Sequence, residues 1–155
     1  CTAFTNVHDL ETVVLRFANV YGPRDTGRVI PLWVGLLQQG KPIEIYGGAQ
    51  VIDFVPVHLV TEALIRAAEA EIVGFPINVA SGMGTPLKEL ARRLIALTGA
   101  HVEPRVLEQR GAEVQRFIAD VRRMRFLLGL TPPTDPLEGL SDLFPPVPAG
   151  APSDG

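Results

Sequence analysis

The sequence has 155 residues, of which 46% are hydrophobic and 20% are charged, and its formal net charge is −3. This composition supplies enough apolar material for a folded core, and it lacks the clustered basic residues of a nucleic-acid-binding surface. The single cysteine excludes an internal disulfide, no apolar run approaches a membrane span, and no zinc-type Cys/His spacing occurs. We therefore predict a cytoplasmic protein with no metal, no nucleic-acid partner and no membrane partner.

Predicted strands and helices alternate along the chain. Residues 12–17 predict a strand buried on both faces, which breaks at Asn19 and at Gly22-Pro23. Apolar residues at helical spacing predict helices, and short apolar runs predict strands. The helices are expected at 28–39, 57–70, 86–98 (capped by Thr85) and 120–128 (capped by Asp120), the strands at 42–46, 51–55 and 76–80, an extended segment at 101–108, and one or two turns at 136–144. This alternation predicts an α/β fold with right-handed crossovers.

The two ends of the sequence differ from its middle. Residues 145–155 are rich in Pro, Ala, Gly and Ser, and they predict a disordered tail. At the other end, the chain begins at Cys1, only a few residues before a strand predicted to be buried on both faces. This start suggests that the chain is the C-terminal part of a longer protein.

Three segments share their pattern with one enzyme family. Residues 15–25 read Leu-Arg-Phe-Ala-Asn-Val-Tyr-Gly-Pro-Arg-Asp, and they follow a predicted strand at the sheet edge where α/β proteins bind ligands. This segment closely resembles the LR-x-x-N-x-Y-G-P stretch of the extended short-chain dehydrogenase/reductase family, the NAD(P)-dependent epimerases and dehydratases of nucleotide sugars. In addition, residues 78–82 resemble the family's N-x-G-S-G turn, and residues 110–113 resemble its Arg-x-Gly-Asp stretch.

The resemblance also shows which parts of the family's enzymes are missing. It implies that residues 1–144 are the C-terminal part of a Rossmann-type doubly wound sheet plus the small α/β substrate-binding domain, without the N-terminal dinucleotide-binding half. The family's Gly-rich turn and its catalytic Tyr-x-x-x-Lys pair do not occur, because Tyr21 and Tyr46 both lack a lysine four residues later. By alignment with the family, these motifs would lie before Cys1. We therefore assign no catalytic residue, and NAD or NADP is implied for the full-length protein.

Gly82-x-Gly84, between a predicted strand and a predicted helix, offers an alternative dinucleotide fingerprint. Leu87 stands where the third glycine would be, although Glu103 could serve as the downstream acid. An incomplete fingerprint is a weak signal, and the family's N-x-G-S-G turn matches the same segment better.

The resemblance implies roles for individual residues. Phe17 matches the position beside the nicotinamide, and Asn19 matches the residue that contacts the substrate's diphosphate. Arg28 and Val29 match positions that touch the nucleotide phosphates at a helix N-terminus, where an anion is favoured. Tyr46 matches the aromatic residue that stacks on uracil, and a flat ring suits that purpose.

The resemblance implies a substrate-binding role for two further residues, and every residue assigned in this way also has a purely structural interpretation. Arg110 and Glu113 match the arginine on the diphosphate and the acid on the ribose hydroxyls, and both residue types suit these ligands. Each assignment has an alternative that stays open: Asn19 as a turn residue, Phe17 and Tyr46 as strand core residues, Arg28 as a solvated arginine, and Arg110 and Glu113 as surface charges.

Residues 51–60 depart from the family's R-D-F-V-Y-V-D-D-V pattern. Ile52 stands where a phosphate-binding arginine is usual, and the lost charge-assisted contact is worth about 1.5–3 kcal/mol. Pro56 replaces Tyr or His, and His58 and Leu59 replace the acids. The nucleotide sugar is therefore held differently from the usual family mode, is not UDP-linked, or is not bound.

The functional expectation follows from these matches and departures. We expect the substrate-binding portion of an NAD(P)-dependent nucleotide-sugar epimerase or dehydratase, inactive as this chain alone. The alternative is a non-enzymatic nucleotide-sugar-binding or regulatory module, and an unrelated α/β domain would require three chance matches in the right order. The family's usual dimer uses helices that lie mostly upstream, so a homodimer is possible for the full-length protein and is not assumed for this chain.

Overall fold

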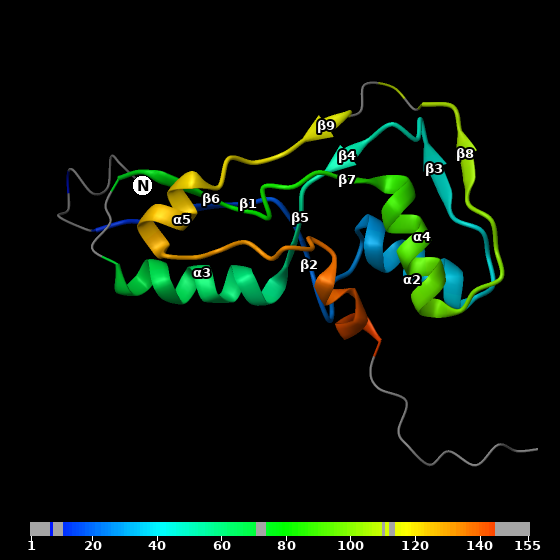
Figure 1. The fold of residues 1–155 in the computed structure, drawn as a ribbon, viewed down its shortest axis with the longest axis horizontal. Helices are drawn as coiled ribbons and strands as arrows, with labels where there is room; N and C mark the ends of the chain where they lie inside the picture. Colours follow the sequence, from blue (N-terminus) through cyan, green and yellow to red (C-terminus); the bar gives the residue numbers. More distant parts are fainter. Residues whose placement is uncertain (1–6, 8–10, 71–73, 110, 112–113, 145–155) are drawn as a thin grey trace, which may run out of the picture.

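The computed structural model describes residues 7, 11–70, 74–109, 111 and 114–144. It is an α/β fold in which most strand pairs are parallel, as predicted (Figure 1). The predicted disordered tail at 145–155 lies outside the described residues.

One part of the molecule, which we call the sheet lobe, is built on the parallel pair of β1 (Val14–Phe17) and β6 (Pro76–Val79). The helix α3 (Val57–Glu69) precedes β6 in the chain, and α5 (Arg122–Leu128) contacts both α3 and β6. A second parallel pair, β2 (Asn19–Tyr21) and β5 (Phe54–Pro56), continues from this lobe, and β5 leads directly into α3. The buried residues of this lobe include Val55, Ala63, Ile77 and Met124.

The other part, which we call the helix-pair lobe, is built on the contact between α2 (Val29–Gln38) and α4 (Leu87–Thr98). It also contains the parallel pair β3 (Glu44–Tyr46) and β8 (Arg105–Leu107). A three-stranded sheet places β4 (Val51–Ile52) between antiparallel β7 (Thr85–Pro86) and parallel β9 (Arg116–Phe117). The 3-10 helix η1 (Glu138–Leu143) ends the described chain.

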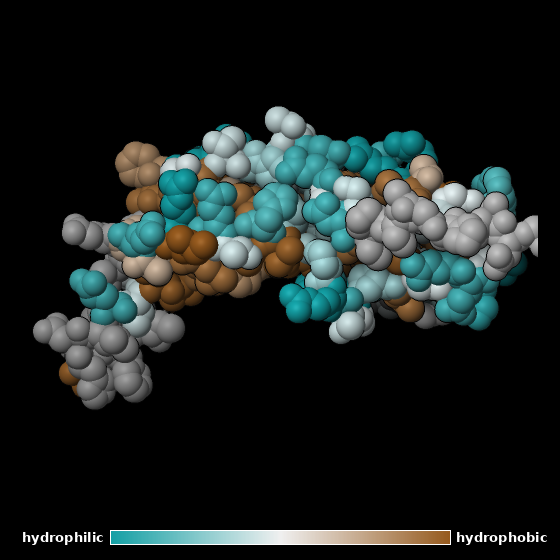
Figure 2. All heavy atoms as spheres, turned by 90° about the horizontal axis from the view of Figure 1, so that it is seen from below, coloured by the Kyte–Doolittle hydropathy of each residue, from teal (hydrophilic) through white to brown (hydrophobic). Residues whose placement is uncertain are grey.

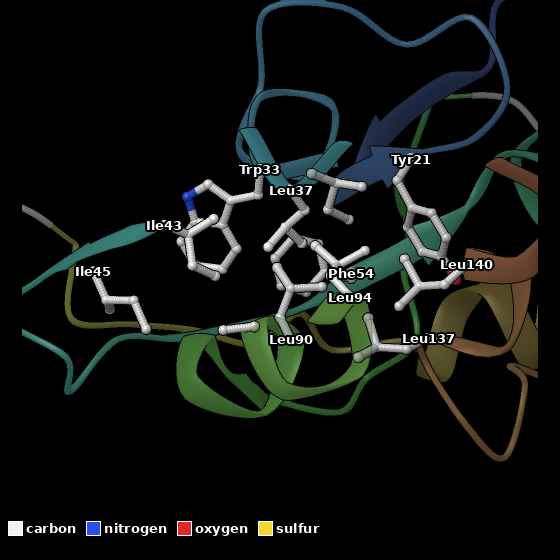
Figure 3. Packing of buried hydrophobic residues seen from close by; sticks show 12 residues of the cluster. Tyr21, Trp33, Leu37, Ile43, Ile45, Phe54, Leu90, Leu94, Leu137 and Leu140 are labelled. Carbon is white, nitrogen blue, oxygen red and sulfur yellow. The ribbon is translucent and has the colours of Figure 1, made fainter. Parts of the chain in front are cut away.

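The core of the helix-pair lobe is closely filled (Figure 3). Trp33 and Leu37 of α2 face Leu90 and Leu94 of α4, and Phe54 lies between the two helices and Tyr21. Apolar residues at helical spacing on both helices produce this packing, as the sequence predicted.

Three strand predictions are wrong in instructive ways. The strand predicted at 51–55 is interrupted at Asp53, because β4 pairs with β7 and β9 whereas β5 pairs with β2. The first strand is not buried on both faces, since Arg16 is exposed and Phe17 is 44% exposed. The chain also does not leave strand structure at Asn19: the interruption is at Ala18, and Asn19 begins β2. In addition, β9 was not predicted, because two residues carry no readable periodicity.

The helices were predicted more accurately, with differences at their ends and faces. α4 begins at Leu87 after its N-cap Pro86, so Thr85 is a strand residue rather than the cap. α5 begins at Arg122, and the N–H of that residue donates to the carboxylate of Asp120 at 2.9 Å. Three leucines in the predicted helices are exposed although leucine is usually buried: Leu32, Leu64 and Leu97. Left-handed glycines, Gly99 and Gly129, end α4 and α5.

Candidate functional site

The carboxyl ends of β1 and β6 lie side by side, with Phe17 opposite Val79. The chain continues from β1 into Asn19 and from β6 into the turn that contains Ser81 and Gly82. Open α/β sheets bind ligands at this edge, so a ligand site is expected close to these residues.

Asn19 is half-buried at the start of β2, and its side chain is part of the fold. Its Nδ2 donates to the backbone carbonyl of Asp53 at 3.2 Å, and its backbone N–H donates to the same oxygen at 3.1 Å. The alternative that Asn19 is a turn residue is therefore wrong. A carboxamide nitrogen carries two hydrogens, so this bond leaves a second N–H as a donor.

Arg28 and Val29 open α2, as the sequence predicted. Arg28 is the N-cap, its side chain is 54% exposed, and its Nε donates to Asp25 Oδ1 at 3.1 Å. Val29 is half-buried against the core of the helix-pair lobe. Arg28 and Asp25 line a surface cavity of about 390 Å³ with the preceding loop. A cation, the first backbone N–H groups of a ten-residue helix and an open cavity together suit an anionic group.

Tyr46 ends β3 with a half-buried ring, and its hydroxyl donates to Glu44 Oε2 at 2.6 Å. The core side chain of this strand is Ile45, which is 1% exposed. Tyr46 is therefore not a core residue, and its ring has the partial exposure that stacking on a ligand requires.

Phe17 lies in a different hollow from Arg28. It lines a cavity of about 520 Å³ between β1 and α3, together with Leu15, Leu64 and Ala67. The alternative that Phe17 is a buried strand residue is wrong, because this side of β1 is open. Arg110 and Glu113, the remaining predicted substrate residues, lie outside the described residues.

Asp53 is a buried residue to which the sequence pattern assigned no role. Its side chain is 0% exposed, and Oδ1 accepts hydrogen bonds from the N–H and the hydroxyl of Ser81 at 2.9 and 2.6 Å. Oδ2 accepts from the N–H groups of Gly82 and Ala119 at 3.0 and 3.1 Å. The available signal was an acidic residue inside the apolar run 51–60, where a buried carboxylate needs several donors.

Tyr21 is the other polar residue of the motif, and it is buried. Its hydroxyl donates to the carbonyl of Pro136 at 3.0 Å and accepts from the N–H of Gly139 at 3.1 Å. Burial raises the pKa of Tyr21, and the hydrogen bond from Gly139 only partly offsets this. The phenol therefore stays neutral, and its role is to hold Pro136 and the first turn of η1 rather than to exchange protons.

The turn after β6 does not fit the pyrophosphate of NAD. The N–H groups of Ser81 and Gly82 already donate to Asp53. A Cβ on Gly84 would lie 2.4 Å from Val51 Cγ1, so this glycine serves close packing of the chain. Of the described residues assigned above, only the exposed ring of Phe17 suits the cofactor. The incomplete fingerprint at Gly82-x-Gly84 is therefore not a dinucleotide site, and we assign no step of a reaction on NAD to these residues.

Metal binding and membrane insertion find no support in the described residues. No group of three or more His, Cys, Asp or Glu side chains is arranged to hold a metal ion in this part of the chain. Likewise, none of the described helices is both long and apolar enough to cross a membrane.

Comparison with known proteins gives a consistent result. The sequence profile described as "NAD dependent epimerase/dehydratase family" matches residues 1–80. A UDP-glucose 4-epimerase of Mycolicibacterium smegmatis is 31% identical over 143 residues, which are 89% of this chain and 46% of the relative.

Solved structures extend this likeness to the fold. A UDP-glucose 4-epimerase of Thermotoga maritima with UDP-glucose superimposes with a TM-score of 0.85 and 31% identity, over 92% of this chain and 47% of the other. MoeE5 in complex with UDP-glucuronic acid and NAD gives a TM-score of 0.80 and 32% identity, over 90% and 48%. This chain thus spans about half the length of the relatives it matches. It belongs to the NAD-dependent epimerase/dehydratase family.

Proposed function

We propose that this chain is the substrate-binding portion of an NAD-dependent nucleotide-sugar epimerase or dehydratase and that it binds the nucleotide diphosphate of the sugar. The observation that carries the proposal is the superposition of 92% of the chain on 47% of a UDP-glucose 4-epimerase with UDP-glucose. The dinucleotide-binding half would be contributed by further polypeptide. NAD, when bound there, supplies the hydride chemistry.

The open face of the sheet lobe supports this division of the enzyme. Among the described residues β1 pairs only with β6, so its other edge is open. Seen from the side of α3, hydrophobic side chains gather over the half of the molecule that carries this helix (Figure 2). Phe17, Leu64 and Ile65 are 44%, 52% and 55% exposed. Contiguous exposed apolar surface of this kind is typical of an interface.

The proposed diphosphate site lies at the start of α2. Arg28 would exchange the carboxylate of Asp25 for a phosphate oxygen, and the N–H of Val29 would donate to the same group. Asn19 would contribute its second Nδ2 hydrogen to the diphosphate, and Tyr46 would stack on the base. By the resemblance, Arg110 and Glu113 would add a phosphate contact and a ribose contact.

One observation favours the non-enzymatic alternative. Ile52, at the position where the family usually has a phosphate-binding arginine, is half-buried and packs against the core of the helix-pair lobe. An apolar side chain in this place gives the diphosphate no charge. A nucleotide-sugar-binding or regulatory module would tolerate this loss better than an enzyme that must hold its substrate for catalysis.

The test is isothermal titration calorimetry of UDP-glucose into the chain, together with an epimerase assay in the presence of NAD. We expect binding without turnover, and binding about tenfold weaker (about 1.4 kcal/mol) in Arg28→Gln. Arg16→Gln is the matched control, because Arg16 is an exposed arginine on β1, outside the α2 cavity. Turnover by the 155 residues alone would refute the division of the enzyme, and absence of binding would refute the substrate site.

A further inference from the structure

Asp53 is the one charged residue that is buried in the described part of the chain. A buried carboxylate is costly unless hydrogen bonds replace its water, and here four donors surround it. These donors come from the turn after β6, through Ser81 and Gly82, and from Ala119, which follows β9. The side chain therefore joins two segments that are distant from it in the sequence.

The backbone of Asp53 joins two more segments. Its N–H donates to the carbonyl of Phe117 in β9 at 2.9 Å. Its carbonyl accepts both the backbone N–H and the Nδ2 of Asn19, at 3.1 and 3.2 Å. One residue thus lies between the three-stranded sheet of the helix-pair lobe and the carboxyl ends of β1 and β6. The chain changes from β4 to β5 at this point, so any shift of Asp53 moves the acceptor to which Asn19 is bonded.

We propose that Asp53 is a positioning residue for nucleotide-sugar binding: through its carboxylate it fixes the turn at Ser81–Gly82, and through its carbonyl it orients the carboxamide of Asn19. This inference rests on the proposed function, since it explains how a side chain on the sheet edge is held ready for the diphosphate. Asp53 itself accepts four hydrogen bonds within the fold and does not contact the ligand.

The chemistry of the four donors explains why aspartate is required. A carboxylate offers two acceptor oxygens, and each accepts two hydrogen bonds here. In Asp53→Asn one of these oxygens becomes an NH₂ group, which would face the N–H groups of Gly82 and Ala119 in the place of Oδ2, or the N–H of Ser81 in the place of Oδ1. The side chain at position 53 must then rotate or move, and we expect the backbone carbonyl of this residue, which orients Asn19, to move with it. Ser81→Ala is a milder change at Asp53, because it removes the hydroxyl, which also accepts from the N–H of Met83, and leaves the three N–H donors to Asp53 in place.

The experiment is a pair of measurements on the ¹⁵N-labelled 155-residue chain. The first measurement is the side-chain NH₂ resonance of Asn19, assigned by its loss in Asn19→Ala. The second is the Kd for UDP-glucose. Controls are Asp142→Asn and Ser141→Ala, which make the same chemical changes at exposed positions in η1.

We expect Asp53→Asn and Ser81→Ala both to shift the Asn19 NH₂ resonance, and we expect neither control to do so. At a temperature where circular dichroism shows the folded state, the Kd should rise about tenfold in Ser81→Ala, equal to about 1.4 kcal/mol. If Asp53→Asn does not fold, Ser81→Ala carries the test alone.

The outcomes separate this inference from the proposed function. An unchanged Asn19 resonance and an unchanged Kd in a folded but less stable Ser81→Ala would mean that Asp53 only stabilises the fold, which overturns the inference. If the wild-type chain does not bind UDP-glucose, the proposed substrate site fails. In that case a shifted Asn19 resonance would still establish the orientation of this side chain by Asp53, and an unshifted one would overturn it.

Discussion

The core between α2 and α4 and the outer face of the sheet lobe differ in how far their apolar residues are buried. In the helix-pair lobe, Leu90 and Leu94 are 0% exposed and Trp33 is 4% exposed between α2 and α4. In the sheet lobe, Phe75 and Phe126 are 59% and 88% exposed, and α3 presents exposed leucine and isoleucine. The core between α2 and α4 is thus closed within this chain, whereas apolar side chains on the outer face of the sheet lobe are exposed. Under the proposed function, further polypeptide would cover that face.

The comparison also bears on function. Arg28 and Val29 lie at the start of α2, and Tyr46 lies on β3, so elements of the helix-pair lobe position all three residues. Phe17 lies on the open face of the sheet lobe. We therefore expect substrate contacts to be retained in this chain and contacts with the cofactor to need the covering polypeptide.

The largest expected effect is a loss of stability caused by a substitution in the core of the helix-pair lobe. Leu94→Ala should lower the free energy of unfolding by about 2–5 kcal/mol, because it leaves a cavity between α2 and α4. Leu97→Ala, on the same helix but 46% exposed, is the matched control and should cost less than about 1 kcal/mol. Equal losses in urea unfolding would contradict the assignment of this core.

The next effect concerns the hydrogen bonds by which Tyr21 holds Pro136 and the first turn of η1. Tyr21→Phe should cost about 1–3 kcal/mol, because the carbonyl of Pro136 and the N–H of Gly139 lose their partner in a buried place. Tyr46→Phe removes an exposed hydroxyl bonded to Glu44 and should cost less than about 0.5 kcal/mol. Thermal unfolding of the two variants measures the difference, and a neutral Tyr21→Phe would refute this role.

A smaller effect on stability, with a larger effect on association, is expected on the open face. The double change Leu64→Ser and Ile65→Ser should alter the free energy of unfolding by less than about 1 kcal/mol. It should reduce self-association in light scattering, because it removes exposed apolar surface. Leu32→Ser, at a 60% exposed position on α2, should leave self-association unchanged. If self-association falls equally in both variants, the exposed face of the sheet lobe is not a specific association surface.

The smallest effect is a pH dependence on the outer face of α4. Hydrogen bonds from Arg92 and then Arg93 lower the pKa of Glu89 from 4.5 to about 2. Between these values the unfolded chain binds more protons than the folded chain, so this contribution is complete above pH 4.5 and is lost as pH falls towards about 2.

In Glu89→Gln, the free energy of unfolding measured in urea should therefore fall less steeply as the pH is lowered from 4.5 towards about 2, which is the acid limb of the stability profile. The remaining slope includes Asp120, whose pKa is also lowered to about 2 by Arg122. Removing the partners instead, in Arg92→Gln with Arg93→Gln, should flatten the same limb. An acid limb identical to that of the wild type in both variants would refute the ion-pair assignment.

Local sequence pattern predicted the helices and the α/β class well, and it predicted long-range pairing poorly. α2, α3 and α4 have apolar residues at regular helical spacing, and all three segments are helices in the structure. Strands of two or three residues, such as β9, have no periodicity, and their existence depends on the partner they pair with. The interruption at Asp53 is likewise tertiary, because its cause is a set of donors 28 to 66 positions away.

The candidate site likewise has features that the local sequence predicted and features that depend on long-range contacts. The motif in residues 15–25 identified Asn19, and the predicted helix start placed Arg28 and Val29 correctly at α2. The bond between Asn19 and Asp53 joins residues 34 positions apart, and no local pattern carries it. The exposure of Phe17 also depends on what covers β1, which the strand's own sequence does not indicate.

The most direct test of the proposed substrate site is a titration of the ¹⁵N-labelled chain with UDP-glucose, followed by the backbone resonances. We predict saturable shifts at Asn19, Arg28, Val29 and Tyr46, with the α3 side of the sheet lobe unchanged. Shifts confined to Leu15, Phe17 and α3, or no shifts at millimolar UDP-glucose, would contradict the claim that this chain holds the nucleotide sugar.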